Sequence, residues 1–423
     1  MEEFGIPARP YFVERQSQPG WQPGMLLDQS DIQHHPARDL ALPRNPRSHY
    51  TFFNYLFEEG RLFEFLNLGL PLPLRKDYAR YVTWAANHFT DQVRFGVAAV
   101  SVTAVPGEAG SPAVEVGLDD GSVVRARVVV LAPGRPPHIP DVFQGITDRR
   151  VYHFTEYLNR LPELVAARQP RLAIIGGSQS AVELVLDASR QLPHGVIINI
   201  LRGFGYRQKD LSPFNCEVYY PQFINYYYEA SEDSKRNLDQ QLRYTNYSSA
   251  DIDVIQALYT QLYEQRLDGV DRVRLLRNTD VIGCDPRPGG VRLTVREVHR
   301  RTVEEIDVDA VVLATGFVDL TDESGAFFLP PMLDPIASAV ARAPSGRAVI
   351  DRDYRLAFAS GATLPSIYLN GLCETTHGMG DAGSFSLLSL RAATIAESVH
   401  KALTCPAYRL AASGTGVHGG VPS

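Results

Sequence analysis

A glycine-rich turn at Gly176-Gly177-Ser178 carries the strongest chemical signal in the sequence. A dinucleotide-binding turn needs a first glycine for the bend and small residues after it, so that backbone N–H groups can approach a pyrophosphate at the start of the next helix. Gly176 and Ser178 occupy the first and third positions of this GxGxxG-type pattern, and Ala181 occupies its last small position. An ordinary strand-to-helix turn is the alternative. The pattern favours a nicotinamide dinucleotide bound by Gly176, Gly177, Ser178, Gln179 and Ser180.

Arg202 lies two residues beyond the next apolar run, residues 196–200. An arginine at this place can bind the 2′-phosphate that distinguishes NADPH from NADH, because its planar guanidinium matches phosphate geometry. The alternative is a solvated surface arginine. The pattern indicates NADPH.

Three other groups of reactive side chains do not make a convincing site. His34 and His35, near Asp31 and Asp39, suggest a metal cluster, but adjacent residues on a strand point to opposite faces, so we expect a pocket-lining histidine and no metal. Cys216 lacks an evident histidine partner for a nucleophile. The tyrosines of residues 219–228 can stack bases, but the net charge of −7 argues against a nucleic-acid partner.

The composition is that of a folded globular protein. Its 423 residues are too many for one core, so we expect two or three lobes, and hydrophobic residues at 44% leave ample apolar material for them. No run approaches the length of a membrane span, and residues 1–25 lack the pattern of a signal peptide. Both observations predict a cytoplasmic protein. The four cysteines lie far apart without a CxxC motif, which predicts reduced thiols.

Short apolar runs place the candidate residues. Residues 128–131, 172–175, 196–200 and 310–313 are rich in β-branched residues, as buried parallel strands are, and 180–191 has a helical pattern. Runs 128–131 and 310–313 both end in a small residue, a glycine and a departing loop. This arrangement predicts an α/β fold with two dinucleotide-binding, Rossmann-like domains, for FAD and NADPH, and a small substrate-covering region. Residues 285–305 alternate as a half-exposed β ribbon, and 205–250 suit a cavity lining.

The ordered motifs resemble the flavin-dependent N-hydroxylating monooxygenases of siderophore biosynthesis, the ornithine/lysine N-hydroxylase family. Five segments carry the resemblance: FVERQSQPGWQPGMLL at 12–27, DIQHHPARDLALPRNPRSHYTFFNYLF at 31–57, SPFNCE at 212–217, RYTNYS at 243–248 and IYLNGLCETTHGMGDAGSFSLLSLR at 367–391. The set is far more specific than any one segment. The resemblance implies N-hydroxylation of the primary amine of an amino acid or related amine, through a C4a-hydroperoxyflavin formed from FAD, NADPH and O₂.

The resemblance also implies a role for individual positions. Gln33, on an active-site strand near the isoalloxazine, and Asn246 are the implied catalytic residues. His377 is expected either to hydrogen-bond near the flavin or to shape a turn. Besides the turn at Gly176 and Arg202, the implied cofactor-binding residues are Glu14, Trp21, Met25, Gln33, Thr315, Gly316, His377 and Gly378. The implied substrate-binding residues are Arg38, Asn215, Cys216, Asn246 and Ser384.

Three departures from the family pattern all concern the substrate. Arg38 stands where the family usually has a lysine that binds the amino-acid carboxylate. Cys216 stands where the family has asparagine, with Asn215 one residue early, and residues 380–384 differ from the usual short serine-containing run. We therefore expect a substrate other than ornithine, with an extra acid or a different amine.

The start of the chain predicts an incomplete domain. In the family a strand and a GxGxxN-like turn precede the strand of Glu14, and residues 1–8 contain no such turn. We expect an FAD-binding domain over 1–165 without its first strand and glycine loop, an NADPH-binding domain over 166–300, a return to the FAD domain over 301–405 and a flexible tail over 406–423. A catalytically impaired binding or partner protein is the alternative function. The resemblance implies a homo-oligomer, a tetramer.

Overall fold

The computed structural model describes residues 5–6, 8–107, 112–320, 329–359 and 364–405. The predicted tail over 406–423 lies outside the described residues. The strands are β1 Phe12–Glu14, β2 Val93–Phe95, β3 Ala99–Pro106, β4 Pro112–Leu118, β5 Val123–Ala126, β6 Val128–Leu131, β7 Val151–His153, β8 Arg171–Ile175, β9 Val196–Ile200, β10 Val273–Leu276, β11 Thr279–Arg287, β12 Gly290–Glu297, β13 Val303–Val308, β14 Ala310–Leu313 and β15 Ser366–Leu369. The helices are α1 Phe52–Glu58, α2 Leu62–Leu68, α3 Arg75–Asn87, α4 Tyr157–Val165, α5 Gln179–Gln191, α6 Pro221–Glu229, α7 Glu232–Leu242, α8 Ile252–Leu267, α9 Glu374–His377, α10 Met379–Ala382 and α11 Leu388–Thr404.

A five-stranded parallel sheet, in the order β10-β9-β8-β14-β7, forms the centre of one lobe. The apolar runs predicted as buried strands at 172–175, 196–200 and 310–313 are β8, β9 and β14, and the helix predicted at 180–191 is α5. Such runs suit central strands, which are covered on both faces. The predicted α/β class with Rossmann-type parallel sheets is confirmed.

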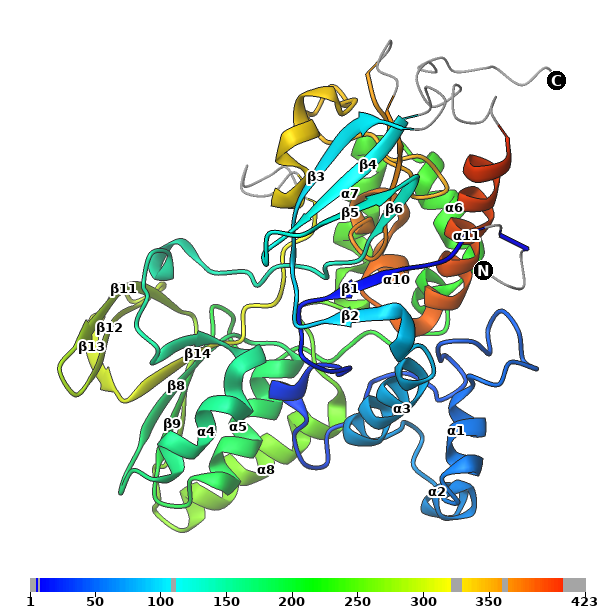
Figure 1. Cartoon of the computed structure of the whole chain (residues 1–423). Coiled ribbons are helices and arrows are strands. Elements are labelled where there is room, and N and C mark those ends of the chain that lie inside the picture. The colour runs from blue at the N-terminus through cyan, green and yellow to red at the C-terminus, as the bar shows by residue number, and fades with distance from the viewer. Residues whose placement is uncertain (1–4, 7, 108–111, 321–328, 360–363, 406–423) are drawn as a thin grey trace.

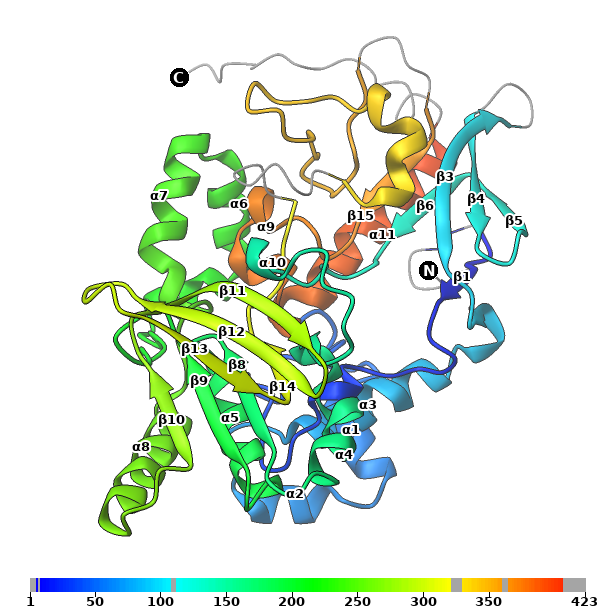
Figure 2. The same ribbon diagram turned by 90° about the vertical axis from the view of Figure 1, so that its left-hand side faces the viewer.

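Two different layers cover this sheet, as Figures 1 and 2 show. Leu172 and Ile174 of β8 pack toward α4, α5 and α8, in one core with Leu184 and Leu258. The residue between them, Ala173, faces the antiparallel β11-β12-β13 ribbon and its buried Leu293. Successive side chains of β8 therefore point to opposite faces of the sheet and pack into both layers. The ribbon predicted at 285–305 is confirmed by β12, whose residues alternate in burial.

The second lobe carries three smaller sheets around one core. An antiparallel β3-β4-β5 sheet lies beside two parallel pairs, β15-β6 and β1-β2. The apolar side chains of β6 and β15 share this core with Val13 of β1 and with α11. Some side chains of the paired strands stay open to solvent: Phe12 is 50% exposed and Val130 is 44% exposed.

The boundaries predicted for the middle domain, 166 and 300, fall inside the five-stranded sheet. β7 at Val151–His153 and β14 at Ala310–Leu313 both hydrogen-bond into it, through residues outside 166–300. Backbone pairing defines a sheet, and the sequence reveals no such pairing. We place this domain at about 151–314.

The loop that carries Gln33 differs from the predicted active-site strand. Only Asp31 forms a β-bridge, with Leu74, and Gln33 has φ of 61°. The carboxylate Oδ1 of Asp31 accepts the N–H of Gln33 at 2.8 Å. Asp side chains that bond two residues ahead favour turns over strands, which explains the correction.

A helical region of α1, α2 and α3 packs around a cluster of aromatic side chains. Phe52, Tyr55, Tyr78 and Tyr81 are all at most 2% exposed. A buried ion pair joins this region to α5, which packs on the five-stranded sheet, because Arg75 of α3 donates to Glu183 at 2.9 Å. Among the described residues, no helix has both the length and the apolar character needed to cross a membrane.

Candidate active site between the two lobes

One large cavity of about 1700 Å³ opens where β8, β9 and β14 end. In open parallel sheets, ligands bind at this carboxyl edge. The cavity brings together most of the predicted residues: Trp21, Met25, Gln33, Arg38, Gly176, Gly177, Ser178, Gln179, Ser180, Arg202, Cys216, Asn246, Thr315, Gly316 and Ser384. Residues from seven separate parts of the chain therefore face one space.

The turn at Gly176-Gly177-Ser178 forms one wall of the cavity and directly precedes α5. Gly176 has φ of 146°, and a Cβ added there would lie 2.3 Å from the carbonyl oxygen of Ala314. A side chain at this position cannot fit. The N–H of Gln179 is bonded to the carbonyl of Ser249, whereas those of Gly177 and Ser178 have no backbone partner among the described residues. These free donors at a helix N-terminus suit a pyrophosphate.

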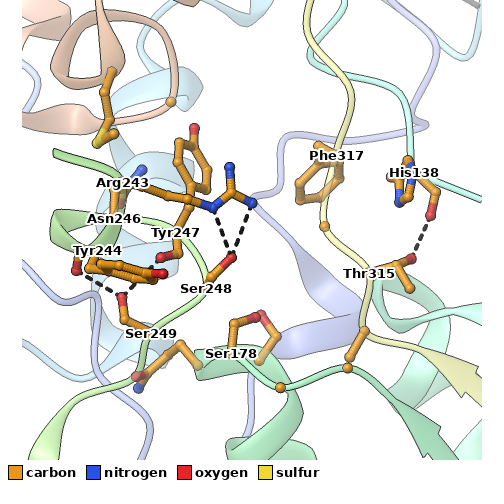
Figure 3. A pocket seen from close by; sticks show the side chains of 18 of the residues that line it. His138, Ser178, Arg243, Tyr244, Asn246, Tyr247, Ser248, Ser249, Thr315 and Phe317 are labelled. Carbon is orange, nitrogen blue, oxygen red and sulfur yellow. Dashed lines mark hydrogen bonds between the residues drawn. The ribbon is translucent and has the colours of Figure 1, made fainter. Parts of the chain in front are cut away.

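The segment that contains Asn246 faces the end of β14 across the cavity (Figure 3). Its shape is fixed locally. The Arg243 guanidinium donates to Ser248 Oγ at 3.1 Å, and Ser249 Oγ donates to the carbonyl of Tyr244 at 2.9 Å. On the far side, Thr315 Oγ1 donates to the carbonyl of His138. Asn246 therefore lies on a loop that these hydrogen bonds fix, opposite the turn that follows β14.

Arg38 and Cys216 lie on adjoining parts of the cavity wall. Asp39, fully buried, accepts the N–H of Phe52 at 2.7 Å and so fixes the chain beside Arg38. The Arg38 guanidinium carbon is 5.4 Å from the ring centre of Tyr219, and no carboxylate among the described residues forms an ion pair with it. Burial raises the pKa of the Cys216 thiol, which keeps it protonated. An unpaired arginine here is suited to an anionic group of a ligand.

Two predicted residues are turned to other partners outside the cavity. Glu14 ends β1, and its Oε1 accepts the N–H of Gln16 at 2.8 Å. The Asn215 amide donates to Asp210 Oδ2 at 2.5 Å, so Cys216 and not Asn215 lines the cavity.

His377 and Gly378 also lie outside the cavity lining. The imidazole of His377 is fully buried and stacks on Tyr354, with ring centres 4.0 Å apart. Burial lowers the pKa of His377 to about 4, so the ring is neutral. A Cβ on Gly378 would lie 3.1 Å from Phe223. This placement favours the second of the two expected roles of His377, which is to shape a turn.

A buried polar network next to Asn246 was not predicted from the sequence. Arg135 Nη1 donates to the Tyr247 hydroxyl at 2.9 Å and to Glu374 Oε2 at 3.1 Å, and Tyr247 donates to the same carboxylate. The N–H of Glu374 donates to Asp319 at 2.9 Å. Desolvation, opposed by Arg135, raises the pKa of Glu374 to about 7 and that of Asp319 to about 6.

The residues of this network lie in or next to motifs already identified in the sequence. Arg135 directly follows the glycine that ends the run at 128–131, and Tyr247 and Glu374 lie inside two of the quoted motifs. Their contact joins residues 112 and 239 positions away from Arg135, which the sequence alone does not reveal.

Comparisons with known sequences and with solved structures each find proteins of one family. The sequence model of the L-lysine 6-monooxygenase/L-ornithine 5-monooxygenase family matches residues 2–319. An L-ornithine N(5)-monooxygenase of Burkholderia cepacia is 36% identical over 376 residues, which are 87% of this chain and 83% of that protein.

Two solved structures share the fold over nearly the whole chain. The ornithine hydroxylase PvdA from Pseudomonas aeruginosa superposes with a TM-score of 0.84 at 31% identity, covering 93% of this chain and 92% of that one. The ornithine N-hydroxylase KtzI from Kutzneria sp. 744, named as a complex with reduced FAD, NADP⁺ and L-ornithine, gives 0.85 at 30% identity and covers 92% of each chain.

Proposed function

Because the chain belongs to the L-lysine 6-monooxygenase/L-ornithine 5-monooxygenase family, we infer that it is a flavin-dependent monooxygenase that N-hydroxylates a primary amine, with FAD and NADPH as cofactors. The observation that carries this is that one cavity is lined by the glycine turn before α5 together with Gln33, Arg38 and Asn246. The alternative of a catalytically impaired binding or partner protein is not favoured, since monooxygenases share the fold over more than nine-tenths of the chain.

The cavity residues fit NADPH and the ring system of FAD. The NADPH pyrophosphate would lie at Gly176, Gly177 and Ser178, where a Cβ at Gly176 would occupy the cradle. Arg202 would bind the 2′-phosphate. Trp21, Met25 and Gln33 would border the flavin, and the buried Gln33 Nε2 has no hydrogen-bond partner among the described residues. Bound FAD, reduced by NADPH, supplies the activation of O₂ for oxygen transfer to nitrogen.

The chain itself binds the amine, orients it and excludes water. An amine with a lysine-like pKa of about 10.4 must lose its proton to act as a nucleophile, which costs roughly 3 kcal/mol near pH 8. Desolvation favours the neutral amine. Trp21, His34, Tyr78 and Phe385 form a mutually packed aromatic cluster, and all but Tyr78 line the cavity. This wall supplies a desolvating surface for the amine.

The substrate proposed here is an amine that carries a carboxylate and is not ornithine. The support is the unpaired Arg38 together with Cys216, whose thiol replaces the amide expected at that position. The purified protein, reconstituted with FAD, should oxidise NADPH and form hydroxylamine with one of a panel of ornithine, lysine, aspartate and diamines. A protein that FAD cannot reconstitute would reject the enzyme, and a clear preference for ornithine would reject the altered substrate.

Arg38→Ala should raise the KM for the preferred carboxylate-bearing amine about 10- to 100-fold, because a charge-assisted contact is lost. NADPH oxidation without substrate should not change. Arg38→Lys, which keeps the charge but not the fork, should fall in between. Steady-state kinetics with a diamine, which has no carboxylate, provides the matched control. An equal loss with the diamine would contradict the role given to Arg38.

We further propose that the protein acts in the cytoplasm as a homo-oligomer, a tetramer in keeping with the family resemblance. The four free cysteines support the location. The open apolar face of α2 supports the association, because Phe63 is 83% exposed and no residue of this helix is buried.

A further inference from the structure

Lys209 is a buried lysine in the wall of the cavity, on the segment that follows β9. It is 7% exposed, and its Nζ lies 2.8 Å from Gln33 Oε1 and 3.3 Å from Asp251 Oδ1. Gln33 is 176 positions away in the sequence, on the loop that precedes α1 and packs beside α3. Lys209 thus joins the segment after β9 to the residue proposed to border the flavin.

The contact with Lys209 fixes which way the amide of Gln33 faces. A lysine ammonium has three donors and no acceptor, so only Oε1 of the amide can face it. The amide Nε2 must then point to the other side. Nε2 is buried and has no partner among the described residues, and Gln33 lines the cavity. A buried donor left unmet is costly, so a bound ligand acceptor is the natural partner.

The backbone of Gln33 is held as firmly as its side chain. Its φ of 61° is in the left-handed region, and its N–H donates to Asp31 Oδ1 at 2.8 Å. The Arg75 Nε donates to the carbonyl of Asp31 at 3.2 Å. Strained backbone of this kind persists only where neighbours determine it. Together with Lys209, these contacts leave the Gln33 amide one orientation.

We propose that Lys209 is a positioning residue for the N-hydroxylation. It holds the Gln33 amide with its N–H₂ aimed into the cavity, where the amide donates a hydrogen bond to an acceptor atom of the flavin or the bound substrate. The proposal rests on the proposed function. Because the donor acts on the oxygen-transfer step, its loss affects coupling more than the delivery of electrons from NADPH.

Lys209→Met tests this in the full-length protein reconstituted with FAD. The fraction of oxidised NADPH that yields H₂O₂ in place of hydroxylamine should rise, and kcat/KM for hydroxylation should fall about tenfold, as expected for one misdirected hydrogen bond. Flavin reduction by NADPH should stay within about twofold of the parent. Lys209→Arg, which can still donate to Oε1, should restore part of the coupling.

Asp251 requires its own control, because Lys209→Met also leaves this carboxylate without its cation. The double variant Lys209→Met/Asp251→Asn removes both charges and should show the same uncoupling. Uncoupling that disappears in the double variant would mean that Lys209 only neutralises Asp251, and would overturn the proposal.

A double-mutant cycle with Gln33→Ala distinguishes an effect of Lys209 that acts through Gln33 from a non-specific effect on the structure. In the Gln33→Ala background, Lys209→Met should have no further effect on coupling. An equal loss in both backgrounds, or no loss in either, would overturn the proposal. A parent protein that forms no hydroxylamine at all would instead reject the proposed function, so the two failures are distinguishable.

Discussion

Replacing Gly176 with alanine is expected to slow flavin reduction by NADPH about 100-fold or more. The new Cβ would lie 2.3 Å from the carbonyl oxygen of Ala314, on a backbone with φ of 146° that side chains rarely adopt. To relieve the contact, the turn must move by about 1 Å, and displacements of that size at a positioning element can cost about a hundredfold in rate. Stopped-flow measurement of flavin reduction over a range of NADPH concentrations would measure the loss.

Two comparisons make this result specific. Dithionite, which needs no dinucleotide site, should reduce the flavin of Gly176→Ala as fast as that of the parent. Gly205→Ala alters another glycine of the cavity wall, but its Cβ would meet nothing within 4 Å. It should behave like the parent. Normal reduction of Gly176→Ala by NADPH would show that this turn does not hold the dinucleotide.

The second large effect concerns stability. Arg75→Ala is expected to lower the free energy of unfolding by about 3–5 kcal/mol, because it leaves Glu183 buried without its cation. The Arg75 and Glu183 side chains are 9% and 6% exposed, and Arg75 also donates to the carbonyl of Met25 at 3.1 Å. Both tryptophans, Trp21 and Trp84, pack in the neighbouring aromatic cluster. Urea unfolding followed by tryptophan fluorescence therefore reports on this region.

The loss of stability is expected to be large because the Arg75–Glu183 pair is buried. A neighbouring ion pair that is exposed to solvent provides the comparison. Lys76 pairs with Asp28, and these side chains are 48% and 61% exposed. Lys76→Ala should cost less than about 1 kcal/mol. Removing both buried charges, in Arg75→Met/Glu183→Leu, should recover much of the loss. A cost below about 1 kcal/mol for Arg75→Ala would mean that Glu183 finds water or another partner.

Local pattern was enough to predict the central sheet, α5 and the glycine turn. The runs that became β8 and β14 are continuous and apolar, and that of β9 is interrupted only by Asn199, so burial on both faces could be read directly. The loop at Gln33 was predicted as a strand because the family resemblance implied one. The Asp31 carboxylate bonds the backbone two residues ahead, and that local bond overrides the strand.

The contacts of the site that could not be predicted join residues far apart in the sequence. Arg75 and Glu183 are 108 positions apart, and Lys209 and Gln33 are 176 apart. No local period encodes such pairs. His377 was identified from a short motif, but the motif does not indicate which way its ring points. The ring stacks on Tyr354 and does not line the cavity.

The two parallel pairs of the second lobe affect how the protein behaves at high concentration. Among the described residues, β1 hydrogen-bonds only to β2, and β6 only to β15. A strand paired on one side offers its other row of amide and carbonyl groups to any extended chain, and the half-exposed Phe12 and Val130 add apolar surface there. Strand addition between molecules, which leads to aggregation, is therefore expected to begin at these edges and not at the cavity.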